Sequence, residues 1–405
     1  MKKARSNIRA IIGRVILENQ GILRLKPAWV ARAFIPPGRR LGLPEDQYDL
    51  GERGGICERW LGSTTLADNK VSVPDEGLSF LNVRSLEEVT LREAVGVVGD
   101  LIMGEDYSRT HSGLERLPKI FDYADRLPFH LHQMQEHAQL VRFNSKEEGY
   151  HFLENVDVGR HPETFFGVHP YIYENKKYDV LLKHLIEWKD DSILQHARAY
   201  LQMPGDGFHV PAGTLHAPGT ALTIELQEDS DVLAMLQAQV GETRIDKELL
   251  FKDMTPDDRQ KFGERRILDM IDWEVNGDPY FYENRHTPPI LDEETMQAGG
   301  EEYWIFYNTM KFSGKKIVVH PGGKFVKSDH GVYTIFIWRG KGLYGKVLVE
   351  GENPAMDELL VCHERAIRPL EIENTGDSDL LIYQFFGPDI NPDVPMLPSY
   401  PLSQN

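Results

Sequence analysis

Cysteine is scarce in this chain of 405 residues: only Cys57 and Cys362 occur, and they stand far apart in the sequence. Two isolated cysteines argue against a disulfide framework and against a zinc site built from thiolates, and they fit a reducing, cytoplasmic compartment. Basic side chains are also in short supply, with 45 Lys and Arg against 63 Asp and Glu and a formal net charge of -18. We therefore expect no general affinity for nucleic acid or for anionic membranes.

Long hydrophobic runs are absent as well. No stretch of about 18 apolar residues occurs, so the sequence predicts no membrane-spanning helix. The N-terminus begins with basic residues, but Arg14 and Glu18 interrupt the apolar stretch that follows, and we expect no secretory signal peptide. The remaining composition, 41% hydrophobic and 27% charged, is that of an ordinary globular protein with room for two or three domain-sized units.

Two blocks of short strand-like runs, separated by helical stretches, predict a mainly β protein. The runs FHLHQ, AQLVRF and GYHFLENVDV predict strands between residues 127 and 157, and alternating strands return from about residue 300 to the end. Helices are predicted over 85–104, where Ser85 would be the cap, over 162–203 and over 245–275. The second block suggests another antiparallel sandwich or barrel, so that the two blocks could be two copies of one fold.

The boundaries between these stretches divide the chain into four parts. We expect N-terminal strands and a helix that contribute to a first module, then the core of that module with a helical insert at 162–203. A charged helical linker and a second module follow. The four ranges are 1–125, 126–240, 241–299 and 300–405.

A histidine pair in the first strand block raises the question of a metal. His130 and His132 are two residues apart, so in an extended strand both imidazoles point to the same face. Glu148 follows on a strand predicted to pair with the first, and His216 follows the turn in PAGTLHAPG. Three imidazoles and one carboxylate suit a divalent first-row metal and leave positions for water or substrate oxygens. For the histidine pair alone, the alternative is a solvated surface strand.

These motifs, in this order, resemble the two motifs of the cupin superfamily: HxH with a later Glu, then PxG followed by His. More narrowly, the sequence resembles type I phosphomannose isomerases. DYADRLPFHLHQMQEHAQ, KEEGYHF and GGICERWLGS are similar to segments of that family, and PGDGFHVPAGTLHAPG with the following ELQEDSD is similar to its third segment. The resemblance spans about residues 20 to 235 and implies a bicupin, that is, two jelly-roll modules with helical insertions.

The resemblance also implies roles for individual residues. The family's metal ligands fall on His130, His132, Glu148 and His216. Its substrate-binding lysine falls on Lys146, and the acidic residue after its histidine motif falls on Glu225. Because His130 replaces a family glutamine, the implied cofactor is one divalent metal, zinc first, with manganese, iron or nickel as alternatives.

The same residues also have interpretations without the family. Lys146 would then belong to a polar hairpin turn, and Glu225 to a polar strand face that is either exposed or part of a pocket. In the second strand block, His320, His330 and His363 lack the HxH spacing. We therefore expect that module to be free of metal and to serve packing.

One departure concerns the family's arginine near the substrate phosphate, because this chain has Met235 there. Methionine cannot bind a phosphate. Either another cation takes its place, with Arg244, Lys247 and Arg285 as candidates, or the substrate carries no phosphate. The residues do not choose between the two.

The resemblance thus implies a metal-dependent aldose–ketose isomerase that interconverts mannose 6-phosphate and fructose 6-phosphate, with Lys146 or Glu225 as the catalytic base. Its partner would be a small sugar or sugar phosphate. A homodimer is compatible with the sequence but is not fixed by it. Three alternatives stay open: an isomerase or epimerase of an unphosphorylated sugar, a cupin dioxygenase, and a non-catalytic sugar-binding protein.

Overall fold

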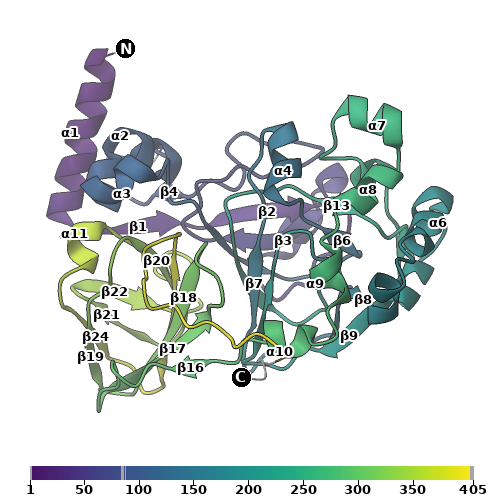
Figure 1. Cartoon of the computed structure of the whole chain (residues 1–405). Coiled ribbons are helices and arrows are strands. Elements are labelled where there is room, and N and C mark those ends of the chain that lie inside the picture. The colour runs from purple at the N-terminus through teal and green to yellow at the C-terminus, as the bar shows by residue number, and fades with distance from the viewer. Residues whose placement is uncertain (1, 84–85, 87, 402–405) are drawn as a thin grey trace.

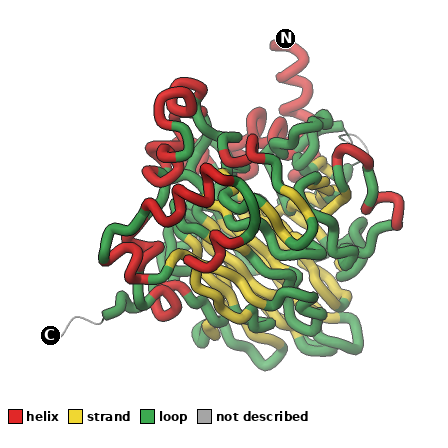
Figure 2. The backbone as a smooth tube through the Cα atoms, turned by 90° about the vertical axis from the view of Figure 1, so that its right-hand side faces the viewer, coloured by secondary structure: helices red, strands yellow, loops and turns green. Residues whose placement is uncertain are grey.

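The computed structural model describes residues 2–83, 86 and 88–401. Antiparallel strands run through the middle of the molecule, and most helices lie along one side and at the top (Figure 2). The strands form two modules, which lie at the right and at the lower left in Figure 1. The chain is therefore a mainly β protein of the bicupin type, as predicted.

Two sheets form the first module, and its core contains side chains from both of them, such as Tyr150, Phe166 and Met235. The first sheet has the strand order β10 (Gly207–Val210), β7 (Glu148–Phe152), β12 (Thr223–Gln227), β5 (Leu117–Phe121), β3 (Gly55–Trp60), β2 (Ala28–Arg32). The second has the order β13 (Ala234–Met235), β6 (His130–Leu131), β11 (His216–Ala217), β8 (Glu163–Val168), β9 (Ala197–Leu201). A separate hairpin joins β14 (Gln239–Val240) and β15 (Thr243–Arg244).

The second module also has two sheets, whose buried residues, such as Ile317, Tyr344 and Ile372, make one core. Its larger sheet has the order β16 (Ile290–Leu291), β17 (Gly300–Phe306), β18 (Ser313–Val319), β25 (Leu380–Phe386), β20 (Tyr333–Arg339), β23 (Glu358–Val361), β1 (Ile22–Lys26), β4 (Phe80–Leu81). The smaller has the order β19 (Lys324–Lys327), β24 (Leu370–Asn374), β21 (Lys341–Tyr344), β22 (Val347–Glu350).

The N-terminal helix and strand β1 lie beside the second module (Figure 1). Strand β1 pairs with β23, and Ile12, Val15 and Ile16 of the N-terminal helix belong to the core of the second module. The prediction that residues 1–125 contribute to the first module therefore applies to β2, β3 and β5 but not to β1, β4 or the helix Leu91–Met103, which belong to the sheet or the core of the second module. The four-part division stays a proposal, with these elements assigned to the second module.

Helices cover the ends of both modules. Near the N-terminus are α1 (Lys2–Glu18), α2 (Leu91–Met103), α3 (Glu105–Thr110) and α11 (His363–Ala366). The first module carries α4 (Gln135–Ala138), α5 (Pro170–Glu174), α6 (Asp179–Glu187), α7 (Pro256–Phe262), α8 (Arg265–Asp269), α9 (Trp273–Gly277) and α10 (Phe281–Arg285). Short 3₁₀ turns are η1 (Glu45–Tyr48), η2 (Gly51–Arg53), η3 (Gln139–Val141), η4 (Ser192–His196) and η5 (Lys247–Leu250). Among the described helices, none has the length and apolar character that a bilayer crossing requires.

The two modules share an apolar layer between β12 and β5 on one side and β17, β20 and β25 on the other. Ile224 and Leu226 of β12 pack there with Phe306 and Phe385. Because successive strand residues point to opposite faces, Thr223, Glu225 and Gln227 point into the first module instead. The strand face that carries Glu225 is therefore buried.

Several predicted elements differ in the structure. Residues 138–143 form the end of α4, η3 and a turn rather than a strand. Within the stretch 162–203 that was predicted as helical, residues 163–168 and 197–201 form β8 and β9. The predicted cap Ser85 lies outside the described residues. Thr90 caps α2 instead, because its hydroxyl accepts from the amide of Glu93 while the Glu93 carboxylate accepts from the amide of Thr90.

Candidate metal centre

Three histidines converge inside the first module. His130 of β6 is the register partner of His216 of β11, and His132 follows directly after β6. One ring nitrogen of each lies within 4.8 Å of those of the other two. Among the described residues, this is the one group of three or more histidine, cysteine or acidic side chains close enough to share an ion.

Glu148 joins this group from the facing sheet. Its Oε1 lies 3.0 Å from Nε2 of His216, and its Oε2 lies 3.2 Å from Nε2 of His132. The prediction that Glu148 sits on a strand paired with the histidine strand is wrong, because β7 pairs with β10 and β12. The four side chains meet across the interior of the module rather than along one sheet.

Backbone carbonyls fix the orientation of all three imidazoles. The Nδ1 atoms of His130, His132 and His216 lie 2.6, 2.7 and 2.8 Å from the carbonyl oxygens of Pro128, Val232 and Thr214, respectively. A carbonyl can only accept, so each Nδ1 must donate its proton, which leaves a lone pair on each Nε2. The lone pair of His132 faces Lys146 Nζ at 2.9 Å. This is the usual arrangement around a histidine that binds a metal.

The protonation states also suit a metal. Burial lowers the pKa of His130 well below its ordinary value and that of His132 to about 3, so both rings are neutral at neutral pH. Burial alone would raise the pKa of Glu148, but Lys146, His132 and His216 hold it well below its ordinary value. Neutral imidazoles and an ionised carboxylate are the forms that bind divalent ions.

Two of the ligand atoms lack hydrogen bonds within the described part of the chain: Nε2 of His216 and Oε2 of Glu148 are buried and unsatisfied. Leaving such atoms unpaired is unfavourable unless another group binds them. Donor atoms that bind one ion at about 2.0–2.2 Å lie roughly 3 Å apart. The separations of 3.0 and 3.2 Å from Glu148 match this requirement, so the site fits a divalent metal.

Lys146 and Glu225, the two predicted catalytic residues, lie beside the ligands. Lys146 Nζ is 3.1 Å from Glu148 Oε2 and 3.5 Å from Glu225 Oε1. Lys119, which the sequence analysis missed, is 3.2 Å from the same Glu225 oxygen. Burial and the charge of Glu148 raise the pKa of Glu225 to about 7 despite these two lysines. The hairpin-turn interpretation of Lys146 is wrong, because this side chain is buried in the site.

A second buried cluster, of which the sequence analysis gave no account, completes the wall of the cavity. Arg32 of β2 lies between Glu58 of β3 and Asp231, at 2.8 and 3.0 Å. A detectable signal was present: WVARAF and GICERW each place charged residues inside an apolar strand run, where a charge is retained only with a partner.

Met235 stands where the phosphomannose isomerases have an arginine near the substrate phosphate. It is buried, pairs with His130 across β13 and β6, and lines the cavity. None of its predicted substitutes does so: Arg244 donates to the carbonyl of Lys189, Lys247 pairs with Glu264, and Arg285 donates to the carbonyl of Asn284. The cations that line the cavity are Arg32, Lys119 and Lys146.

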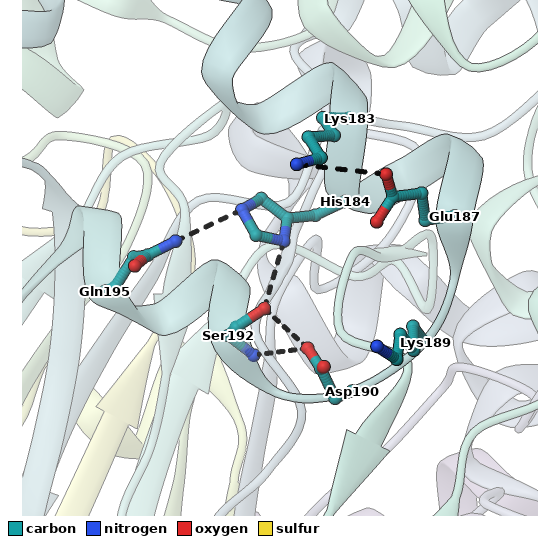
Figure 3. A pocket seen from close by; sticks show the side chains of 7 residues that line it. All are labelled: Lys183, His184, Glu187, Lys189, Asp190, Ser192 and Gln195. Atoms are coloured by element: carbon teal, nitrogen blue, oxygen red, sulfur yellow. Dashed lines mark hydrogen bonds and ion pairs between the residues drawn. The ribbon is translucent and has the colours of Figure 1, made fainter.

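Another pocket opens on the helical insert (Figure 3). There Ser192 Oγ lies 3.2 Å from Nδ1 of His184, which superficially resembles a serine nucleophile with its base. However, the same hydroxyl donates to Asp190, and the carboxylate does not orient the imidazole as a catalytic triad requires. This pocket is therefore a polar surface depression rather than a second catalytic centre.

In comparisons with known proteins, no protein-family model and no curated protein matches the sequence. Solved structures do match over nearly the whole chain, and they share the two-module β architecture described above.

Several of the matching structures are mannose 6-phosphate isomerases. The enzyme from Bacillus subtilis is 15% identical, with a TM-score of 0.62 over 90% of this chain and 99% of that one. A mutant of phosphomannose isomerase from Salmonella typhimurium is 12% identical, with a TM-score of 0.59 over 91% and 100% of the chains. A zinc-bound mannose 6-phosphate isomerase is 12% identical, with a TM-score of 0.58 and the same coverage. This chain has their fold.

Proposed function

We propose that this protein is a metal-dependent aldose–ketose isomerase. The observation that supports this most directly is the convergence of His130, His132, Glu148 and His216 beside a lysine and a glutamate in one buried cluster at the cavity. The fold of mannose 6-phosphate isomerases adds to it and makes mannose 6-phosphate and fructose 6-phosphate the first pair to test. At 15% identity or less, the fold alone does not carry the substrate over.

The three histidines and Glu148 would hold the metal. Zinc is the first candidate, because one structure with the same fold is zinc-bound, and manganese, iron and nickel suit the same ligands. A divalent ion here would supply Lewis-acid polarisation and orientation of the two sugar oxygens. The hydrogen bonds from the imidazoles to carbonyls keep the ligands in place before the ion arrives.

The residues next to the ligands would move the proton. Isomerisation transfers a proton between C1 and C2, so one base must reach both carbons from the same side of the sugar. Glu225 suits this task because its Oε1 faces the two lysines and has no hydrogen bond within the described residues. Lys146 then donates to the sugar oxygen on which negative charge develops.

His216→Ala tests the metal centre. We expect the purified variant to lose most of its bound metal and its isomerase activity, because one of the four ligands is removed. Metal content is measured by mass spectrometry, and activity by ketose formation from mannose 6-phosphate and from free aldoses. The matched control is His137→Gln, a histidine that donates to the carbonyl of Asp269 away from the cavity and should change neither.

Three results would contradict the proposal. The first is unchanged metal content in His216→Ala. The second is oxygen consumption by the iron-loaded protein with a sugar substrate, which would favour the dioxygenase alternative. The third is sugar binding without turnover by any metal form, which would favour a non-catalytic binding protein.

A further inference from the structure

The cavity beside the metal ligands offers almost no free hydrogen-bond donors. Arg32 has five N–H donors, and five hydrogen bonds engage them all. Two go to Glu58 at 2.8 and 3.2 Å, two to Asp231 at 3.0 and 3.1 Å, and one to Asn69 at 3.1 Å. A phosphate dianion needs such a guanidinium fork, and here carboxylates already hold it.

The other donors around the cavity are also engaged. The phenol of Tyr123 donates to Glu58, and that of Tyr150 donates to Glu148. Lys146 has three neighbours within 3.5 Å: His132, Glu148 and Glu225. Lys119 is held between Glu225 and Glu58 at 3.2 and 3.9 Å. Among the described residues that line the cavity, no cation is without a carboxylate partner.

Acceptors, in contrast, are available. Glu225 lines the cavity, and its carboxylate has about four lone-pair sites, of which the two lysines beside Oε1, at 3.2 and 3.5 Å, occupy at most two. Carboxylates accept hydrogen bonds from hydroxyl groups and repel phosphate oxygens. Phe34, Leu233 and Met235 add apolar wall, which suits the C–H faces of a sugar. Met235 stands beside His130, so this wall offers no charge next to the metal ligands.

We propose that the substrate of this site is an unphosphorylated aldose, whose hydroxyl groups donate to the cavity carboxylates while two of its oxygens face the metal. This inference rests on the proposed isomerase function. It distinguishes this protein from the structures that share its fold, which are named for a phosphorylated sugar.

The test compares one hexose with and without its phosphate. Metal-loaded protein is assayed with D-mannose, a panel of other free hexoses and pentoses, and mannose 6-phosphate. We expect kcat/KM for at least one free aldose to exceed that for mannose 6-phosphate by about tenfold or more. The reason is that the phosphate group would find no unpaired cation in the cavity and would face its carboxylates. Millimolar inorganic phosphate should not compete with the free aldose. A preference for mannose 6-phosphate over every free aldose would overturn the inference and leave the isomerase proposal intact.

A variant of Asp231 tests the physical reason. Asp231→Asn removes a carboxylate charge from Arg32 and releases part of the guanidinium for an anion. The ratio of kcat/KM for mannose 6-phosphate to that for the free aldose should then rise about tenfold. Asp357→Asn is the matched control, because Asp357 holds Arg59 in the same two-bond manner outside the cavity and should leave this ratio unchanged. An unchanged ratio in Asp231→Asn would count against the proposed role of the Arg32 pairing.

Calorimetry separates the two proposals if no sugar is turned over. Titration of the metal-loaded protein with free aldoses, mannose 6-phosphate and inorganic phosphate then measures binding alone. Binding of a free aldose but not of the two phosphates would contradict the isomerase function and support the substrate class. Binding of the phosphates, or of neither class, would overturn the substrate class as well.

Discussion

Glu225 is the residue on which the proposed proton transfer depends. It is buried and lines the cavity, and Lys119 of β5 and Lys146, which precedes β7, lie 3.2 and 3.5 Å from its Oε1. The lysines stabilise its carboxylate while burial and Glu148 disfavour it, and the balance places its pKa at about 7. A base poised near neutral pH can both remove and return a proton.

Glu225→Gln is expected to lower kcat by about 10²–10⁴-fold, the usual contribution of a general acid–base residue. The metal content should not change, because Glu225 is not one of the four ligands. Steady-state kinetics with the most active aldose, together with metal analysis, checks both statements. Glu228→Gln is the control, since this side chain pairs with Lys311 instead. If Glu225→Gln kept full kcat, Lys146 would become the base.

At this scale the sequence predicts residues that belong to short motifs. His130, His132, Glu148, His216, Lys146 and Glu225 all meet in the cavity, because the spacing of each motif is local. The apolar surroundings of Arg32 indicate a buried charge, but its acidic partner Asp231 stands 199 residues away, so the sequence does not predict the pair itself.

At the scale of elements, β7 shows how one strand serves two purposes. Glu148 and Tyr150 point into the cavity, whereas Gly149 and His151 point toward the second module. A side chain at Gly149 would meet the ring of Phe306 at 3.0 Å, so glycine permits the close approach. The ring of His151 packs beside those of Phe306 and Tyr383, with distances of 6.4 and 5.6 Å between ring centroids.

His151→Leu is expected to stabilise the protein. Both ring nitrogens of His151 are buried and lack hydrogen bonds within the described residues, and burial lowers its pKa to about 3. Removing unsatisfied polar atoms should raise the free energy of unfolding by about 1 kcal/mol at pH 7. At pH 5 the gain should grow by about 2 kcal/mol. In the unfolded wild type His151 binds a proton below its ordinary pKa of roughly 6.5, whereas in the folded protein it stays neutral, so lowering the pH destabilises only the wild type.

Urea unfolding at the two pH values measures this gain, with His330→Leu, at an exposed histidine, as the control that should follow wild type. A loss of stability at both pH values would show that the ring contacts of His151 outweigh its unpaired nitrogens. Metal content should stay at the wild-type level, because His151 lies on the face of β7 opposite to Glu148.

Strand and helix types were predictable where the apolar period was clear, as in β12, α6 and the strands from β17 onward. Two segments were wrong for identifiable reasons. Residues 138–143 carry β-type residues but follow directly on α4, and the chain closes that helix with η3. The partner of β7 was unpredictable because β6 and β7, although consecutive in the sequence, belong to different sheets.

At the scale of the whole molecule, the two modules are joined by an apolar layer and by an ion cluster within it. Arg59 of β3 donates to Asp357 at 2.6 Å and to Glu358 of β23 at 3.1 Å. The amide of Gly62 donates to Glu358 as well, at 2.7 Å. One guanidinium faces two buried carboxylates, so one negative charge is incompletely compensated. Burial, with a contribution from Asp357, raises the pKa of Glu358 to about 7.

Glu358→Gln should therefore change how stability depends on pH. The folded wild type holds a proton on Glu358 up to about pH 7, whereas the unfolded chain releases it near pH 4.3. The stability from this proton is fully present below pH 4.3 and is lost as the pH rises through 7. Glutamine resembles the protonated acid at every pH. The variant should thus gain about 3 kcal/mol relative to wild type between pH 4.5 and pH 8.

Thermal and urea unfolding across this pH range measure the difference, with Glu52→Gln, on an exposed 3₁₀ turn, as the control that should follow wild type. The comparison also tests whether the cluster couples the modules. Since Arg59 and Glu358 come from different modules, a change at Glu358 should shift one common unfolding transition rather than a separate step of the second module. If the stability of Glu358→Gln changed with pH in parallel with that of wild type, Arg59 would neutralise both carboxylates. Glu358 would then carry no proton at neutral pH.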